Sequence, residues 1–102
     1  MDPRTAFDRR EELQFLDVRE KDEWDAGHIE GSAHIPMDSV PDRLDQIDRG
    51  RPVVAVCRSG RRSGLVAAYL SRAGFTVHNM TGGLEQWEAE GLPLTGRRTQ
   101  AG

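Results

Sequence analysis

The sequence predicts an α/β domain built on a central, mainly parallel sheet of four or five strands, with helices on both faces. Short apolar segments alternate along the chain with segments of helical periodicity, which is the pattern of β–α–β units. One apolar segment, PVVAVC, is uninterrupted and rich in valine, as in a strand that is buried on both faces. The 102 residues suffice for one domain with one core.

The first elements are a possible helix and a strand. Residues 5–12, TAFDRREE, could form a short helix with Thr5 as its cap, or could be loose. Residues 13–18, LQFLDV, form a short apolar run and predict the first strand.

A short helix and a short strand are predicted next. Residues 21–27, KDEWDAG, predict a helix that turns Trp24 inward as a core anchor and stops at Gly27. Residues 32–36, SAHIP, predict a second short strand.

The middle of the chain holds a predicted helix and the most buried strand. Residues 40–48, VPDRLDQID, place a proline where a helix can start. Three apolar residues in this segment recur at helical spacing: Val40, Leu44 and Ile47. Residues 52–57 are the PVVAVC segment, which predicts a fully buried strand.

The last third of the chain repeats the alternation. Residues 64–74, GLVAAYLSRAG, predict a helix that Gly74 ends in a left-handed conformation. Residues 75–80, FTVHNM, predict another strand. After a Gly–Gly pair, LEQWEAEG predicts a final helix with Leu84 and Trp87 on one face.

The charge distribution argues against a polyanionic partner and for a small anion. The net charge of −3 gives no global attraction to nucleic acid or to an anionic membrane. Acidic residues crowd the first half of the chain, whereas none lies between Asp48 and Glu85. Within that interval, three arginines surround the single cysteine: Arg58, Arg61 and Arg62. This basic cluster favours a small anionic ligand.

The single cysteine, Cys57, limits the chemistry of the chain. It excludes an internal disulfide and a cysteine-rich zinc site, and it favours a reducing compartment. His34 and His78 show no metal-ligand spacing with it. The sequence shows no signal peptide and no apolar run long enough to span a bilayer. We therefore expect a cytoplasmic protein without cofactor or metal, with a monomer as the default.

Cys57 ends the most buried predicted strand, and a loop with the sequence RSGRRS leads from it into a helix. Ligands bind at the carboxyl ends of strands in open parallel sheets. Backbone amides of such a loop and the helix N-terminus stabilise a thiolate, and can lower a thiol pKa from ~8.5 to roughly 3.5–7.5. Gly60 lets the backbone curl, Ser59 offers a hydroxyl, and Ser63 is placed to cap the helix.

Two other interpretations of Cys57 remain open at this point. A lone cysteine at a strand end is usually a small buried hydrophobe. The same loop could also hold a phosphate without any chemistry at the thiol. Core cysteines are not normally followed by a polar, glycine-containing arginine cluster, so we favour a reactive thiolate.

Three separated motifs carry a family resemblance. LDVREKDEWDAGHIEGSAHIP, VVAVCRSGRRSGLVAAYLSRAGF, and GGLEQW with GLPL occur in order between about Phe15 and Leu94. Together they resemble a single-domain rhodanese, a thiosulfate sulfurtransferase-like protein. The resemblance implies a three-layer domain with a central parallel sheet. It also implies that sulfane sulfur passes from a donor such as thiosulfate, through a cysteine persulfide, to a thiophilic acceptor.

The resemblance assigns roles to the residues of the loop. Cys57 would be the persulfide-forming nucleophile, and the main-chain amides from Arg58 to Ser63 would cradle the outer sulfur. The loop would thus bind substrate through six residues: Arg58, Ser59, Gly60, Arg61, Arg62 and Ser63. The arginine side chains would attract the anionic end of the donor. With no second cysteine, the acceptor must be external: cyanide, a small thiol or a partner protein.

Asp17 and Arg19, in DVRE, match the first-strand motif of the family and would share the rim of the sheet with Cys57. They could support the loop or line its entrance. We favour an internal scaffold instead, with an ion pair such as Arg19 with Glu23. His28, in GHI, is interpreted as a structural histidine that braces a turn rather than as a base.

Two other functions are possible for such a site: that of a phosphatase or arsenate reductase, and that of a persulfide carrier. Phosphatases and arsenate reductases of the same fold have an arginine after five intervening residues, but here that position is Ser63. A non-catalytic persulfide carrier serving a partner enzyme would use the same thiol and differ only in its acceptor.

The predicted boundaries are a lead-in at residues 1–12, the rhodanese-like domain at 13–95 and a flexible tail at 96–102. The lead-in is shorter than is usual in the family, so an edge element could be shortened or missing.

Overall fold

Four short parallel strands form the middle layer of the molecule, in the order β2–β1–β3–β4. The computed structural model describes residues 1–96, so the predicted tail lies, except for Gly96, outside the described residues. The strands of the sheet are β1 (Gln14–Asp17), β2 (Ala33–His34), β3 (Val53–Val56) and β4 (Val77–Asn79). Four or five strands were predicted, and the sheet has four.

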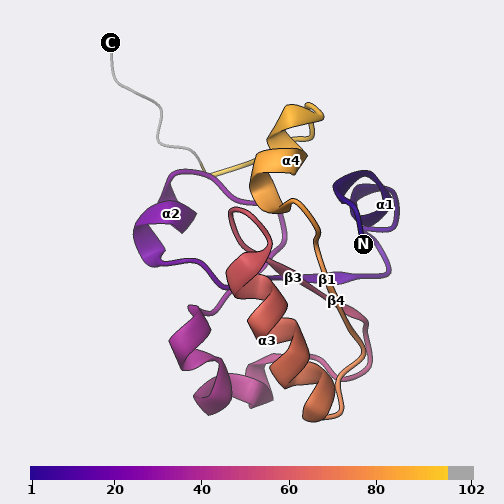
Figure 1. The fold of residues 1–102 in the computed structure, drawn as a ribbon, viewed down its shortest axis with the longest axis vertical. Coiled ribbons are helices and arrows are strands. Elements are labelled where there is room, and N and C mark those ends of the chain that lie inside the picture. The colour runs from indigo at the N-terminus through magenta and orange to yellow at the C-terminus, as the bar shows by residue number, and fades with distance from the viewer. Residues whose placement is uncertain (97–102) are drawn as a thin grey trace.

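Helices cover both faces of this sheet, as expected (Figure 1). The helices α1 (Pro3–Asp8) and α4 (Gly83–Ala89) lie over one face. The helix α3 (Arg61–Arg72) and a 3₁₀ helix, η1 (Met37–Gln46), lie over the other. The short helix α2 (Lys21–Asp25) stands at one side, close to the start of α3. The predicted three-layer α/β architecture is confirmed.

The core consists of one apolar cluster on each face of the sheet, because successive strand residues point to opposite faces. Phe15 packs with Trp87 and the other residues of the α1 and α4 side, whereas Leu16 packs with the α3 and η1 side. Every residue of β3 is buried. This confirms the prediction that PVVAVC is a central strand.

Three local predictions for the helices were wrong. The first helix begins earlier than expected, and Asp2, not Thr5, caps it by accepting a hydrogen bond from the Thr5 amide. The segment after β2 forms 3₁₀ turns rather than an α-helix, with a break at Arg43. Pro41 lies inside this segment and lacks the N–H that an α-helix would need.

Trp24 is not the core anchor that its helical position predicted. Its side chain is only half-buried, and its ring lies between two imidazoles, 3.5 Å from the ring centre of His28 and 4.8 Å from that of His34. Trp87, in contrast, is 1% exposed and contacts Phe7 and Phe15 edge-to-face. Only the second tryptophan anchors the core.

The N-terminal residue covers the edge of the sheet next to β4. The Met1 amino group donates to the Asn79 carbonyl at 3.0 Å, and the Thr81 amide donates to the Met1 carbonyl at 2.9 Å. Although the lead-in is short, it therefore places backbone groups along an edge strand that would otherwise be open.

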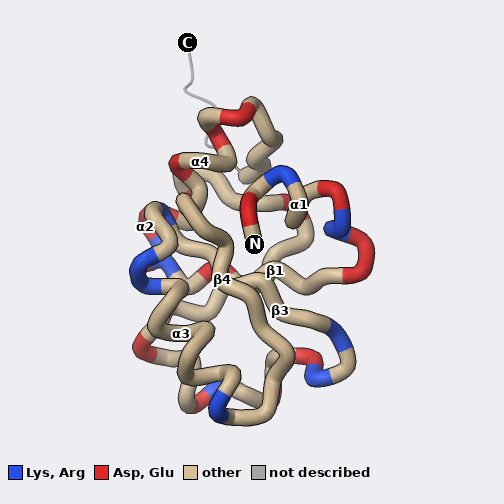
Figure 2. The backbone as a smooth tube through the Cα atoms, turned by 45° about the vertical axis from the view of Figure 1, so that its right-hand side comes forward, with Lys and Arg blue, Asp and Glu red and all other residues tan. Residues whose placement is uncertain are grey.

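Charged residues lie mainly on the helices and connections, and the strands in the middle are almost free of them (Figure 2). Asp17 is the exception, at the end of β1. Within residues 1–96, no helix is both long enough and apolar enough to cross a bilayer.

Candidate active site

Cys57 lies at the carboxyl end of β3, where the chain curls into the N-terminus of α3. Its sulfur accepts hydrogen bonds from the Gly60 amide at 3.1 Å and from the Ser63 hydroxyl at 3.3 Å. Gly60 has a φ of 95°, which L side chains rarely adopt, so glycine is needed for the curl. The loop therefore turns hydrogen-bond donors inward, onto a sulfur that it buries completely.

This environment sets the acidity of the thiol. Burial by itself would raise the pKa of Cys57, because it disfavours the charged form. Hydrogen bonds from the Ser63 hydroxyl and from the backbone amides of Ser63, Gly60 and Ser59 oppose it and lower the pKa of the thiol. The net direction is downward, as the sequence predicted. These hydrogen bonds stabilise the thiolate form relative to that of an ordinary cysteine.

We expect the rate of alkylation of Cys57 by iodoacetamide to follow this lowered pKa. The thiolate is the nucleophile, so the rate rises as the pH passes upward through the pKa of the folded protein. Its midpoint should lie below that of the same thiol in urea-unfolded protein. The variant Ser63→Ala removes one donor and should move the midpoint upward. A folded midpoint equal to the unfolded one would contradict the hydrogen-bond argument.

Ser63 does not cap α3 as predicted. Gly60 occupies the cap position, and Ser63 lies buried in the first turn. Its hydroxyl contacts both the Cys57 sulfur and the Asn79 side-chain oxygen, 2.6 Å away. The Asn79 amide in turn donates to the Gly60 carbonyl at 2.9 Å. Asn79, at the end of β4, thus holds both the loop and the hydroxyl that contacts the thiol.

The N-terminus of α4 holds the other side of the loop. The amides of Leu84 and Glu85 donate to the carbonyls of Cys57 and Arg58 at 2.9 and 3.0 Å. Gly83 makes this approach possible, because a Cβ at its position would lie 2.6 Å from the Cys57 carbonyl oxygen. Gly83 also has a φ of 59°. The loop is therefore fastened by backbone contacts from two directions.

The three loop arginines differ in their partners. Arg58 pairs with Glu85 at 3.0 Å, with both side chains exposed. Arg62 makes two hydrogen bonds, of 2.7 and 2.8 Å, to Glu23 of α2. Arg61 is exposed, and no acid pairs with it among the residues that the structure describes. Of the three loop arginines, Arg61 is thus the one whose charge no described acid compensates.

The Arg62–Glu23 pair fastens α2 to the start of α3. The hydrogen bonds from Arg62 lower the pKa of Glu23 to about 2, and the pKa of Arg62 is raised for the same reason. The two side chains are 32% and 27% exposed. This pair is a bidentate, partly buried interaction, which is stronger than an ordinary surface ion pair.

We expect Glu23→Gln to lower the free energy of unfolding by about 1 kcal/mol at pH 7. The folded pKa of Glu23, about 2, lies below its ordinary 4.5. The carboxylate therefore contributes stability that is fully present above the unfolded value and is lost as the pH falls toward 2. The difference in the free energy of unfolding between the wild type and Glu23→Gln should therefore become smaller as the pH falls from 4.5 toward 2.

Urea unfolding at several pH values measures this difference, with Lys21→Gln as the control. Lys21 pairs with Asp25 on the same helix, and its side chain is 79% exposed. Its loss should cost at most ~0.5 kcal/mol. A Glu23→Gln effect no larger than that of Lys21→Gln would show that the pair does not stabilise α2.

Asp17 and Arg19 form the internal scaffold that we favoured, but with each other. The Arg19 guanidinium donates to both carboxylate oxygens of Asp17, at 2.8 to 3.1 Å, and to the Gly27 carbonyl at 2.7 Å. Both residues are buried. The predicted pairing of Arg19 with Glu23 was wrong, because Glu23 faces Arg62.

The histidines next to this scaffold are structural. His28 contacts the Trp24 carbonyl through Nδ1 at 3.0 Å, and its backbone pairs with Thr95. His34 contacts the Arg19 carbonyl through Nε2 at 2.8 Å. Within residues 1–96, no group of three or more His, Cys, Asp and Glu side chains is arranged to hold a metal ion.

Comparison with known proteins gives one matching family and several relatives. Residues 5–90 match the model of the rhodanese-like domain. A putative sulfurtransferase of Bacillus subtilis, YtwF, is 41% identical over 83 residues, which are 81% of each chain. The thiosulfate sulfurtransferase GlpE of Pseudomonas aeruginosa is 38% identical over 89 residues, which cover 85% of this chain and 81% of GlpE.

A solved structure has the same fold over nearly the whole chain. The crystal structure of a rhodanese-related protein from Thermoplasma volcanium superimposes with a TM-score of 0.91. The match covers 95% of this chain and 97% of that protein, at 26% sequence identity.

Proposed function

Because the chain belongs to the rhodanese-like domain family, and its relatives include named sulfurtransferases, we propose that it transfers sulfane sulfur through a persulfide on Cys57. The donor is thiosulfate or another persulfide, and the acceptor is a thiophilic group outside the chain. The observation that carries this proposal is the buried Cys57 sulfur, which several inward-facing donors hold and acidify.

The chemistry of the first half-reaction balances without a cofactor. The Cys57 thiolate attacks the outer sulfur of thiosulfate, and a new S–S bond forms. The S–S bond of thiosulfate breaks, and sulfite leaves with its electron pair. The terminal sulfur of the persulfide keeps the negative charge that it carried in thiosulfate, and the sulfite that leaves carries two negative charges. In the second half-reaction, an acceptor takes this sulfur and restores the thiolate.

The loop residues would serve this reaction in two ways. The amides between Arg58 and Ser63, including those of Ser59 and Gly60, would stabilise charge on the transferred sulfur. Arg61 would attract the dianion, whereas Arg58 and Arg62 are already compensated by acids. The scaffold of Asp17 and Arg19 would keep the neighbouring strand end in place.

The position of Ser63 supports a sulfurtransferase over an oxyanion enzyme with a related loop. An arginine is needed at that position to bind a tetrahedral anion, according to the family pattern. Here the Ser63 side chain is buried and contacts the thiol itself. A loop of this kind would hold one sulfur atom. The compartment is a separate inference: a single unpaired cysteine fits the reducing conditions of the cytoplasm.

Intact-protein mass spectrometry tests the proposal. After incubation with thiosulfate, the mass should increase by one sulfur atom, and cyanide should then remove it as thiocyanate. Small thiols should discharge the persulfide as well, because no second cysteine can resolve it within the chain. An unchanged mass, with the thiol still open to alkylation, would exclude thiosulfate as the donor and move the search to a protein-bound persulfide.

A further inference from the structure

We propose that an acceptor protein docks on the groove between η1 and α3, through one apolar side chain in the groove and one acidic side chain on Arg61. The surface that we call the α3 groove is lined by Met37, Val40, Pro41, Leu65, Val66 and Tyr69. The proposal rests on the proposed function, because it identifies the kind of partner that would discharge the Cys57 persulfide.

The α3 groove is an apolar part of the surface, and its Leu65 lies two residues after the end of the active-site loop. Leu65 is 66% exposed, and it is the large hydrophobic side chain that the described part of the fold leaves exposed. Val40 and Val66 form the buried floor beneath it. An exposed leucine over an apolar groove is unfavourable in water, and a partner side chain that covers it would be stabilised by the burial.

The size of the groove decides what kind of ligand it fits. Its volume is about 110 Å³, whereas small-molecule pockets usually enclose roughly 300–1,000 Å³. A groove well below that range has room for a single side chain rather than for a whole small molecule. The groove fits one anchor residue of a protein and not a cofactor.

Arg61 links the groove to the thiol. It is the fourth residue of the loop and the first residue of α3, and Leu65 follows four positions later. Residues four apart share one face of a helix, about 6 Å apart along its axis. A partner that approaches the loop from the side of Arg61 would therefore reach Leu65 with a neighbouring residue.

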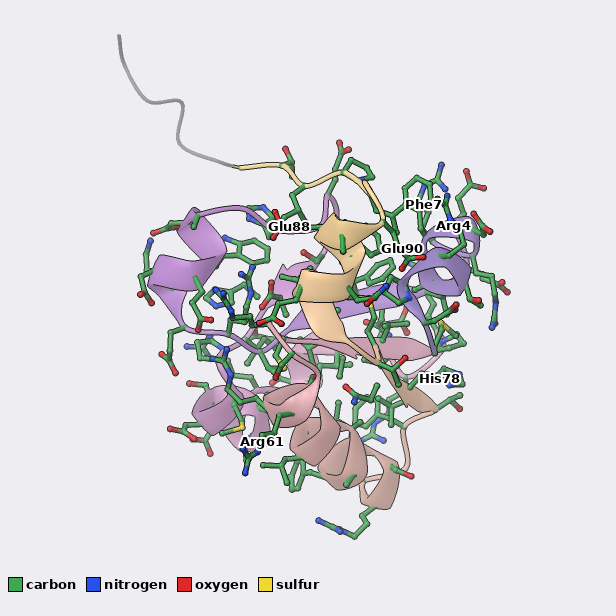
Figure 3. All side chains as sticks on the ribbon, turned by 45° about the horizontal axis from the view of Figure 1, so that its top comes forward. Arg4, Phe7, Arg61, His78, Glu88 and Glu90 are labelled. Carbon is green, nitrogen blue, oxygen red and sulfur yellow. The ribbon has the colours of Figure 1, made fainter. Side chains whose placement is uncertain are left out.

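The charges around the loop select an acidic partner and direct it to this side. Arg61 is the loop arginine without an acid partner among the described residues, whereas Arg58 and Arg62 are paired. In Figure 3, the Arg61 side chain extends outward from the start of α3. The cleft on the other side of the loop, between α2 and α4, is lined by two arginines, Arg19 and Arg58, and by four acids: Asp22, Glu23, Glu85 and Glu88. Glu23 and Glu85 are paired with arginines, but the acids still outnumber the arginines in this lining. Asp38 and Asp42 of η1 do not line the α3 groove.

A contact of this size suits a transfer reaction. One anchor side chain and one ion pair bury far less than the roughly 1,200 Å² at which stable interfaces begin. The partner would therefore bind weakly and leave after it has taken the sulfur. Because rim charges act mainly on the rate of association, the effect should appear in the rate of sulfur transfer.

The test measures how fast the persulfide is discharged by synthetic thiol peptides. The probe is a capped pentapeptide with the order cysteine, glycine, aspartate, glycine, leucine. One control peptide has lysine for aspartate, and another has serine for leucine. Cyanide serves as an acceptor that needs no docking. We expect the probe to react about five to ten times faster than either control peptide, because one exposed ion pair and one partly buried apolar side chain each contribute an effect of that order.

Two variants test whether the preference for the probe peptide depends on Arg61 and on the α3 groove, and a third variant is a control. Arg61→Glu should reverse the order of the aspartate and lysine peptides. Leu65→Ser should remove the advantage of leucine over serine in the peptide and leave cyanide discharge unchanged. Arg4→Glu makes the same charge reversal at an exposed position of α1, on the far face of the sheet (Figure 3), and should change nothing.

The outcomes separate this proposal from the proposed function. If cyanide discharges the persulfide but the peptides react equally, the docking proposal is wrong and the sulfur transfer stands. A preference that survives Arg61→Glu, or a Leu65→Ser variant that slows cyanide as much as the peptides, would also overturn the docking proposal. If no persulfide forms from any donor, the proposed function itself fails.

Discussion

Replacing Cys57 by serine is expected to abolish sulfur transfer and to leave the fold intact. A hydroxyl at this position stays protonated at neutral pH and has no sulfur on which a persulfide can form. The expected loss is at least about a thousandfold, as is usual when the nucleophile of a covalent mechanism is removed. The serine oxygen can still accept the hydrogen bonds from Gly60 and Ser63. The free energy of unfolding should therefore change by about 1 kcal/mol or less.

A displaced thiol provides the control for this variant. Ser71 is exposed on α3, three turns away from the start of the helix. In the Cys57→Ser background, Ser71→Cys restores one thiol but none of the donors around it. This double variant should react with alkylating agents and take up no sulfur from thiosulfate. Uptake by the displaced thiol, or substantial activity in Cys57→Ser alone, would show that the loop is not the site.

Asp17→Asn is expected to cause the largest loss of stability. The Asp17 carboxylate accepts hydrogen bonds from the guanidinium and the backbone amide of Arg19, and both side chains are almost fully buried. Removing one charge leaves the other buried without compensation, which costs about 3–5 kcal/mol. Since small domains are stable by only about 5–15 kcal/mol, this loss removes a large part of the free energy of unfolding, and the variant should unfold at a much lower urea concentration than the wild type. Urea unfolding at 10–25 °C measures the loss.

A double variant separates the buried charge from the packing. Asp17→Asn with Arg19→Met removes both charges and keeps a long apolar side chain under the Gly27 carbonyl. Because a buried ion pair can often be replaced without a net cost, the double variant should recover more than half of the lost stability. If it is no more stable than Asp17→Asn alone, the unpaired arginine is not the cause of the loss.

The sheet and the position of the thiol could be predicted because each depends on a pattern of residues that are contiguous in the sequence. PVVAVC is apolar at every position, and the β3 strand is buried at every position. The curl at Gly60 and the donors from Gly60 and Ser63 lie within six residues of Cys57. A local pattern of this kind determines local geometry, and the structure agrees with it.

The partners of the loop could not be predicted, because they come from distant segments. Arg62 meets Glu23, which is 39 residues away, although the chain has 17 acids from which to choose. Ser63 was expected to cap a helix, and instead it reaches Asn79, 16 residues further on. A polar residue at the end of the strand next to β3 was the one signal for Asn79. Gly83 resembled an ordinary turn glycine, and only the fold shows the Cys57 carbonyl against it.

The contacts that hold the loop come from residues later in the sequence, so the site can form only late in the synthesis of the chain. The ribosome makes the chain from its N-terminus, so Cys57 and Ser63 are joined before Asn79, Gly83 and Leu84 exist. Until those later residues are added and packed, the contacts from Asn79, Leu84 and Glu85 that hold the loop are missing. We therefore expect the Cys57 thiol to reach its full reactivity only when β4 and α4 complete the domain.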